Sequence, residues 1–257
     1  MKRPVSRPFL MTAGLIFLLV TACVLPGLAP TPTADPEPAP LWPQVTLGSL
    51  SFEETGQGPD YTLTTHTPVL SGSEDLRVVV FNQQMTILVQ EEVDRFRQWL
   101  ADMPALPIAA GSFLDLNFEL VSPPGRLLSL LFTAQFYADG AAHPGSTHRS
   151  VTYDLETGSF LGLERLFLPG ADHLGRISEL CMAELGARDI GFDMFSSGAE
   201  PTEANYAVWN VTAAGLQITF EEYQVAAYAA GPQTVLIPYD QLADILDLSG
   251  PLADRIP

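Results

Sequence analysis

Basic residues are scarce in this sequence, and lysine is nearly absent. The 257 residues include 12 lysines and arginines against 30 aspartates and glutamates, which gives a formal net charge of −18, and Lys2 is the only lysine. Nucleic-acid binding needs a basic patch, and anionic wall polymers or lipid head groups would be repelled. The composition therefore excludes a nucleic-acid partner. It is consistent with a basic protein partner, or with a charge that serves solubility alone.

Cysteine is also scarce, because the chain contains only Cys23 and Cys181. Cys181 lies in an apolar pattern of helical spacing, GRISELCMAELGARD, which predicts a buried and inert thiol. A nucleophilic cysteine would need an electropositive setting and a paired histidine, and only His173 is near. Because Cys23 is assigned to a lipid below, no disulfide is expected.

The N-terminus has the pattern of a bacterial lipoprotein signal. Lys2 and two arginines precede an apolar run, Phe9 to Val20, which is typical of a secretory signal and short for a spanning helix. The run ends in L-V-T-A-C, which resembles a lipobox whose cysteine is acylated. We therefore predict a signal peptide at residues 1–22, a lipid on Cys23 and a location on the extracytoplasmic face of a bacterial cell membrane. An ordinary signal peptide or a signal anchor with a chance cysteine is the alternative.

The sequence after Cys23 predicts a tether and then a folded body. Residues 23–43 are rich in Pro, Ala and Thr, a composition that forms a semi-rigid spacer. About 215 residues remain, enough for one large or two small domains. We expect a small strand–helix subdomain at residues 44–110 and an α+β domain at residues 111–257.

Hydrophobic periodicity predicts the elements of this body. One face of a long helix is expected where apolar residues recur every three or four positions, at Phe81, Met85, Val89, Val93, Phe96 and Leu100. Strands are expected at YTLTTHTPVL, FLDLNFELVS, RLLSLLFTAQFYADG, RSVTYDLETG, YAVWNV, LQITFEEY and QTVLIPY. Further helices are expected around Cys181 and at YDQLADILDL. The order predicts an α+β fold with antiparallel or mixed sheets, each packed by one or two helices.

A turn-rich segment, residues 137–158, concentrates polar side chains in the run YADGAAHPGSTHRSVTYDLETG. Its possible ligands are His143, His148, Asp139 and Asp154. The two histidines lie five residues apart, which fits neither the helical nor the tight-loop spacing of zinc sites. No serine here lies in a nucleophile elbow. We therefore expect a structural loop without metal or cofactor, which can still serve as a recognition surface.

The C-terminal third adds aromatic candidates. Tyr223, Tyr228 and Tyr239 suit a binding surface because tyrosine is a good interface anchor, although alternation through LQITFEEY favours core or rim positions. Glu221 and Glu222 would point to opposite faces of a regular strand, which makes a poor carboxylate pair for glycoside chemistry. The candidate ligand-binding surface is therefore His143, His148, Tyr223, Tyr228 and Tyr239.

The order of motifs carries a family resemblance. G-x-x-H-P, Y-D-L-x-T-G, a helical insert, G-L-x-I-x-F-x-x-Y and A-A-G-x-x-x-V-x-I-P-Y follow one another between Tyr137 and about Leu246. This region resembles the extracellular domain of the lysozyme-sensing anti-sigma factor family, which is also found beside some peptidoglycan deacetylase domains. The segment from Val45 to Pro107 resembles, less closely, the small domain that usually precedes it.

The departures from that family define the expected function. An anti-sigma factor needs a cytoplasmic segment and a spanning helix, and a deacetylase needs a catalytic domain; this sequence offers a lipobox and no residues for either. The resemblance thus implies the binding module by itself, without catalysis, which binds or senses a basic lysozyme-like enzyme or a wall-derived ligand. Two alternatives stay open: an envelope hydrolase that uses His143, Asp139 and Glu221 or Glu222, and a scaffold lipoprotein.

Overall fold

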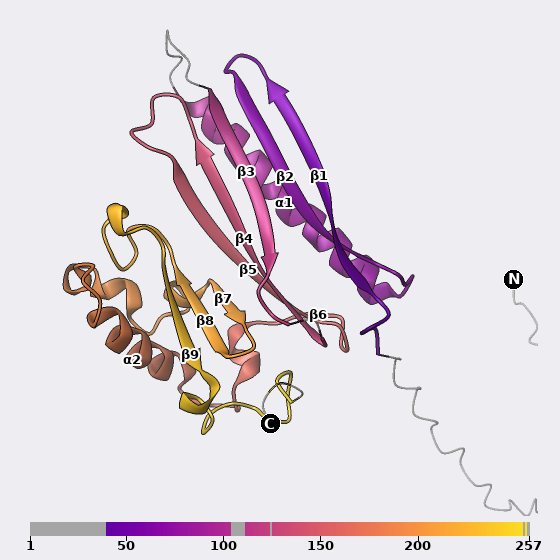
Figure 1. Ribbon diagram of the computed structural model, residues 1–257, viewed down its shortest axis with the longest axis vertical. Coiled ribbons are helices and arrows are strands. Elements are labelled where there is room, and N and C mark those ends of the chain that lie inside the picture. The colour runs from indigo at the N-terminus through magenta and orange to yellow at the C-terminus, as the bar shows by residue number, and fades with distance from the viewer. Residues whose placement is uncertain (1–39, 104–110, 124, 254, 256–257) are drawn as a thin grey trace, which may run out of the picture. The chain divides into compact units, whose positions relative to one another are not determined.

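The computed structural model describes residues 40–103, 111–123, 125–253 and 255 (Figure 1). The chain divides into two units, Met1–Glu37 and Pro38–Pro257, and only the second contains described residues. The predicted signal peptide, the lipidation site Cys23 and most of the predicted tether lie outside them. All residues of the two hydrophobic cores lie between Leu41 and Leu252, so the second unit contains both cores.

Six strands form the larger sheet, in the same order in space as along the chain. They are β1 (Thr46–Gly56), β2 (Tyr61–Ser71), β3 (Ser112–Leu120), β4 (Leu127–Tyr137), β5 (Gly145–Asp154) and β6 (Ser159–Phe160). Every neighbouring pair is antiparallel except β2 and β3, which are parallel. The sheet is therefore mixed, and the parallel pair requires the crossover helix that connects β2 to β3. Strands from both predicted subdomains contribute to it.

Helix α1 (Leu76–Asp102) is that crossover, and it packs mainly on β2 and β3. Its buried residues include Phe81, Met85 and Val93, as the periodicity predicts. The helix begins at an aspartate N-cap, Asp75, whose carboxylate accepts a hydrogen bond from the backbone N–H of Arg77 and so satisfies one free donor of the first turn.

The smaller sheet has three antiparallel strands in the order β7 (Trp209–Val211), β8 (Gly215–Phe220) and β9 (Gln233–Pro238). Helix α2 (His173–Gly186) packs against β9 and contributes Ile177, Cys181 and Leu185 to the core of this sheet. Short 3-10 helices join these elements, at Leu163–Leu166, Phe192–Met194, Ser196–Ala199, Glu203–Tyr206, Tyr228–Ala230 and Tyr239–Gln241. The fold is thus α+β, as predicted from the sequence.

Strand β4 takes part in both cores because its side chains alternate between the two faces of the sheet. Leu128 and Leu130 belong to the core beneath α1, and Leu127 to the core of the smaller sheet. The buried Ser129 Oγ accepts hydrogen bonds of 3.0 Å from Asn210 Nδ2 and from the backbone N–H of Val211. These contacts fix β7 against the larger sheet.

The helix predicted at YDQLADILDL is wrong. The structure has a 3-10 helix, Tyr239–Gln241, followed by turns. Backbone groups that a helix would use internally pair with another segment instead. The N–H of Leu168 donates to Ile245 O, and the N–H of Asp247 donates to Leu166 O. The buried leucines of the segment gave a helical pattern, but a β-bridge to residues 166–168 determines its backbone.

Within the part of the chain that the structure describes, neither helix has both the length and the apolar character needed to cross a lipid bilayer.

Candidate functional site

Three of the five candidate residues form one stack of rings, called here the aromatic stack: His143, Tyr228 and Tyr223. The ring centroids of His143 and Tyr228 lie 3.8 Å apart, and those of Tyr228 and Tyr223 lie 5.6 Å apart. Both pairs are nearly parallel, with interplanar angles of 29° and 28°. The Tyr228 hydroxyl donates a 2.7 Å hydrogen bond to Pro144 O. The loop before β5 is thereby joined to the segment between β8 and β9.

Tyr223 has an unusual backbone. Its φ of 66° is the one positive value at a non-glycine residue within the described ranges, and the left-handed region costs such a residue about 1–2 kcal/mol. Tyr223 is 56% exposed, so burial does not offset this cost. Strain of this kind is tolerated where the surroundings impose it, often at functional positions.

Gln224 imposes the turn that carries Tyr223. Its Oε1 accepts from the backbone N–H of Glu221, and its Nε2 donates to Gly198 O and Asn205 O, each at 2.9 Å. Three hydrogen bonds thus hold the residue after Tyr223 in place. The tyrosine ring is presented to solvent by a rigid turn.

Two carboxylates flank the stack, and both are held by β5. Glu221 accepts from the backbone N–H of His148 at 2.6 Å and bonds the Nδ1 of the same histidine at 2.9 Å. Glu222 accepts from Ser146 Oγ at 2.8 Å. The opposite-face expectation assumed a regular strand, but β8 ends at Phe220, and both side chains reach the same strand. Glu221 keeps 30% of its side-chain surface exposed.

Tyr239 lies apart from the other four candidates. It is 9% exposed and belongs to the core of the smaller sheet, where its hydroxyl donates to Thr212 O at 2.9 Å. Burial raises the pKa of Tyr239 to about 12, with a smaller opposing effect from Arg255. The structure therefore brings His143, His148, Tyr223 and Tyr228 together around one turn and places Tyr239 in a structural position.

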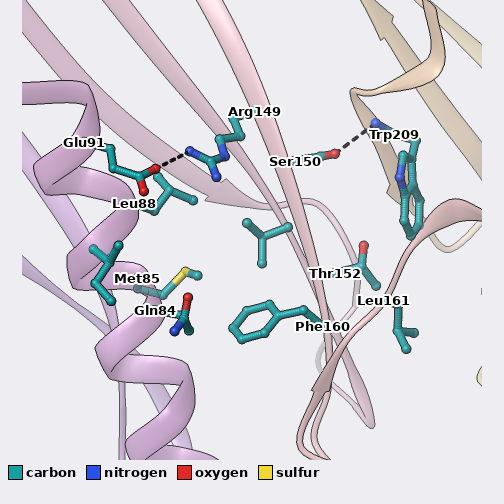
Figure 2. A pocket seen from close by; sticks show the side chains of 12 residues that line it. Gln84, Met85, Leu88, Glu91, Arg149, Ser150, Thr152, Phe160, Leu161 and Trp209 are labelled. Atoms are coloured by element: carbon teal, nitrogen blue, oxygen red, sulfur yellow. Dashed lines mark hydrogen bonds and ion pairs between the residues drawn. The ribbon is translucent and has the colours of Figure 1, made fainter. Parts of the chain in front are cut away.

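A separate pocket of about 260 Å³ lies between α1, β5 and β7 (Figure 2). Its apolar lining includes Met85, Phe160 and Trp209, and its one ion pair joins Glu91 to Arg149 at 3.1 Å. The other polar side chains of the lining, Gln84, Ser150 and Thr152, are neutral. No sequence pattern predicts this pocket, because its residues meet only through tertiary packing.

Residues of the alternative catalytic hypothesis are hydrogen-bonded to the backbone or to β5. The Nδ1 of His143 bonds Pro144 O at 2.8 Å, and Glu221 and Glu222 are engaged with β5. Cys181 is fully buried, which raises the pKa of its thiol to about 12 and keeps it protonated at neutral pH. Among the described residues no cluster of three His, Cys, Asp or Glu side chains is arranged to hold a metal ion.

Comparisons with known proteins identify a matching family model and a curated relative. The model of a family described as "Protein of unknown function (DUF3298)" matches residues 164–240, which include Tyr223, Tyr228 and Tyr239 but not the two histidines. The chain is 26% identical over 160 residues to the peptidoglycan-N-acetylmuramic acid deacetylase PdaC of Bacillus subtilis. That alignment covers 61% of this chain and 34% of the relative, so the chain spans about a third of its length.

Two solved structures of DUF3298 proteins have the same fold. The protein from Bacteroides fragilis superimposes with a TM-score of 0.62 at 17% identity, covering 82% of this chain and 96% of the other. The protein from Pseudomonas aeruginosa gives 0.55 at 13% identity, covering 79% and 94%. The predicted likeness to a domain that occurs with peptidoglycan deacetylases is thus confirmed, and the specific link to anti-sigma factors stays a prediction. The chain shares the fold of solved DUF3298 proteins, and its residues 164–240 match the model of that family.

Proposed function

We propose that this chain is a lipid-anchored, extracytoplasmic binding module that captures a basic protein such as a lysozyme-like enzyme and does no chemistry of its own. The observation that carries the proposal is the aromatic stack beside Glu221 and Glu222. The exposed ring of Tyr223 offers a π face to a lysine or arginine of a partner. Glu222, which accepts from Ser146 through Oε1, can accept charge-assisted hydrogen bonds from the same cation through its other oxygen. A rigid turn lowers the entropy that is lost on binding.

The charge of the whole chain supports the same partner. A net charge of −18 creates a negative potential that attracts a basic protein and raises the association rate. Cys181 is fully buried and its thiol is protonated, so it does not supply a nucleophile. Similarity to a peptidoglycan deacetylase supports a place in the cell envelope.

The anchor is part of the proposal. Acylation of Cys23 would hold the module at the membrane, because each buried methylene of an acyl chain contributes about 0.8 kcal/mol. In bacterial cells supplied with radiolabelled palmitate, the parent chain should become labelled and a Cys23→Ser chain should not. A parent chain without label would rule out the lipid anchor.

The binding site is tested with matched variants of residues 38–257 in calorimetric titrations against hen egg-white lysozyme. Tyr223→Ala removes an exposed ring of the stack, and Leu168→Ala truncates a comparably exposed side chain that is not part of it; the two residues are 56% and 45% exposed. Truncation of an interface anchor costs about 2 kcal/mol, or more than tenfold in affinity. We expect that loss for Tyr223→Ala alone. Equal affinities of the two variants would exclude the aromatic stack as the site.

A further inference from the structure

Strand β1 forms one edge of the larger sheet (Figure 1). It pairs with β2 along all 11 residues, one residue opposite one, from Thr46–Ser71 to Gly56–Tyr61. Among residues 40–103, 111–123, 125–253 and 255, no strand pairs with its other side. The outer backbone groups of a long and regular strand are thus available to another chain.

Most of the devices that usually protect a sheet edge are missing from β1. Natural edge strands carry charged residues, lysine above all, or proline, contain a bulge, or are short. This strand, TLGSLSFEETG, has no lysine, proline or bulge. Leu50 and Phe52 are 62% and 52% exposed, and they lie two residues apart, on one face of the strand. The only charges are on Glu53 and Glu54, and Arg97 pairs with Glu54 at 2.7 Å.

We propose that β1 pairs antiparallel with β1 of a second copy, about a twofold axis at Ser51. In an antiparallel pair, two residues that lie opposite each other either both point their backbone N–H and C=O groups toward the partner strand or both point them away from it. Along one strand these two orientations alternate. The axis must therefore pass through a residue rather than between two residues. Ser51 is the middle residue of β1, so this axis alone pairs all 11 positions.

The side chains favour the same axis. Leu50 of each copy then lies opposite Phe52 of the other, which brings four exposed apolar side chains together on one face. Glu53 lies opposite Ser49, and Glu54 opposite Gly48, so no two carboxylates face each other. An axis at Phe52 would place Leu50 opposite Glu54, and an axis at Glu53 would place the two Glu53 side chains opposite each other. The strand is self-complementary at Ser51, as a twofold interface requires.

The strength of the dimer should depend on salt in an unusual direction. A single pair of strands buries much less surface than the about 1,600 Å² of a standard stable complex. We therefore expect dissociation constants in the micromolar range. Both copies are strongly acidic and repel each other. The Debye length falls from about 10 Å at 0.1 M salt to about 3 Å at 1 M. Added salt should therefore strengthen association, by about tenfold between these concentrations. This inference does not depend on the proposed function.

The first test is analytical ultracentrifugation of residues 38–257, which contain both cores, from about 5 to 300 µM at low and high salt. We expect a monomer–dimer equilibrium that tightens with salt. Leu50→Lys should abolish the dimer although it lowers the overall repulsion. Val79→Lys, at a 50% exposed position on α1, introduces the same charge and should leave the dimer intact. A monomer under all conditions, or equal effects of the two lysines, would overturn the proposal.

The second test reads the register. Ser51 of the two copies would be direct neighbours across the axis, with Cβ atoms about 5 Å apart, so Ser51→Cys should form a cross-linked dimer under mild oxidation. Thr55→Cys is the control, because the two Thr55 positions would be separated by about 26 Å at 3.3 Å per residue. Cys181 is fully buried and should not react. A dimer that cross-links through Thr55→Cys, or through neither, would refute this register.

Discussion

At the scale of single residues, Tyr223 combines a strained backbone with an exposed ring. A positive φ is uncommon at non-glycine residues, and hydrogen bonds of the Gln224 side chain hold the turn that imposes it here. The strain lies beside two carboxylates and two other rings, and this coincidence makes the position a functional candidate. The tyrosine ring can be separated from the backbone strain by comparing two substitutions at one position.

We predict that Tyr223→Gly is more stable than Tyr223→Ala. Both variants lose the ring, but only alanine keeps a Cβ, which is unfavourable at a φ of 66°. The free energy of unfolding of the glycine variant should be higher by about 1 kcal/mol, measured by urea denaturation. At ordinary loop positions alanine is the more stabilising of the two residues. An alanine variant as stable as the glycine variant would show that the turn is not strained.

At the scale of elements, α1 depends on its N-cap, Asp75. Hydrogen bonds from the Arg77 side chain and then from its backbone N–H lower the pKa of Asp75 to about 2. An unfolded aspartate has a pKa near 3.9. Because the folded pKa is the lower one, this contribution to stability is complete above about pH 5 and is lost as the pH falls toward 2.

We therefore predict that Asp75→Asn makes the free energy of unfolding less dependent on pH in acid. Asparagine caps helices about as well as aspartate but does not titrate. Between pH 5 and pH 2 the variant should lose less stability than the parent chain in urea unfolding experiments. Asp75→Ala is the control for the cap itself and should cost about 1 kcal/mol at pH 7. Equal pH dependence of the asparagine variant and the parent would contradict the assignment of a titrating cap.

The elements also show which parts of the fold the sequence could predict. The apolar face of α1 and the strands β2 to β5 have clear periodicities, and the structure confirms them. Strand β1 gave no such signal, because none of its residues is fully buried and polar and apolar side chains do not alternate. The C-terminal segment had a helical pattern but bonds to residues 166–168. Pairing partners, rather than local pattern, decided both cases.

The sequence predicted the residues of the candidate site but not how they are arranged. The residue types indicated a recognition surface, and four of the five candidates lie around one turn. Their proximity depends on contacts between residues more than 70 positions apart, such as His148 with Glu221 and Pro144 with Tyr228. Sequence periodicity carries no information on such contacts. It could not show that Tyr239 is buried, or that Glu221 and Glu222 reach the same strand.

At the scale of the whole molecule, the two sheets should unfold together. Strand β4 contributes to both cores, and Ser129 joins it to β7 through buried hydrogen bonds. Leu130→Ala in one core and Ile218→Ala in the other should each lower the stability by about 2–5 kcal/mol. Each should shift a single unfolding transition, seen equally by tryptophan fluorescence and circular dichroism. Two separate transitions would show that the cores are independent.

The measurement that tests the account most directly is a calorimetric titration of residues 38–257 with hen egg-white lysozyme at about 0.05 M and 0.3 M NaCl. If the acidic module captures a basic protein, binding should be saturable and should weaken at the higher salt concentration, because opposite charges are screened. Two results together would contradict the proposed capture of a lysozyme-like partner. One is no heat of binding at tens of micromolar protein, and the other is that a mixture of the two proteins sediments as the separate proteins do.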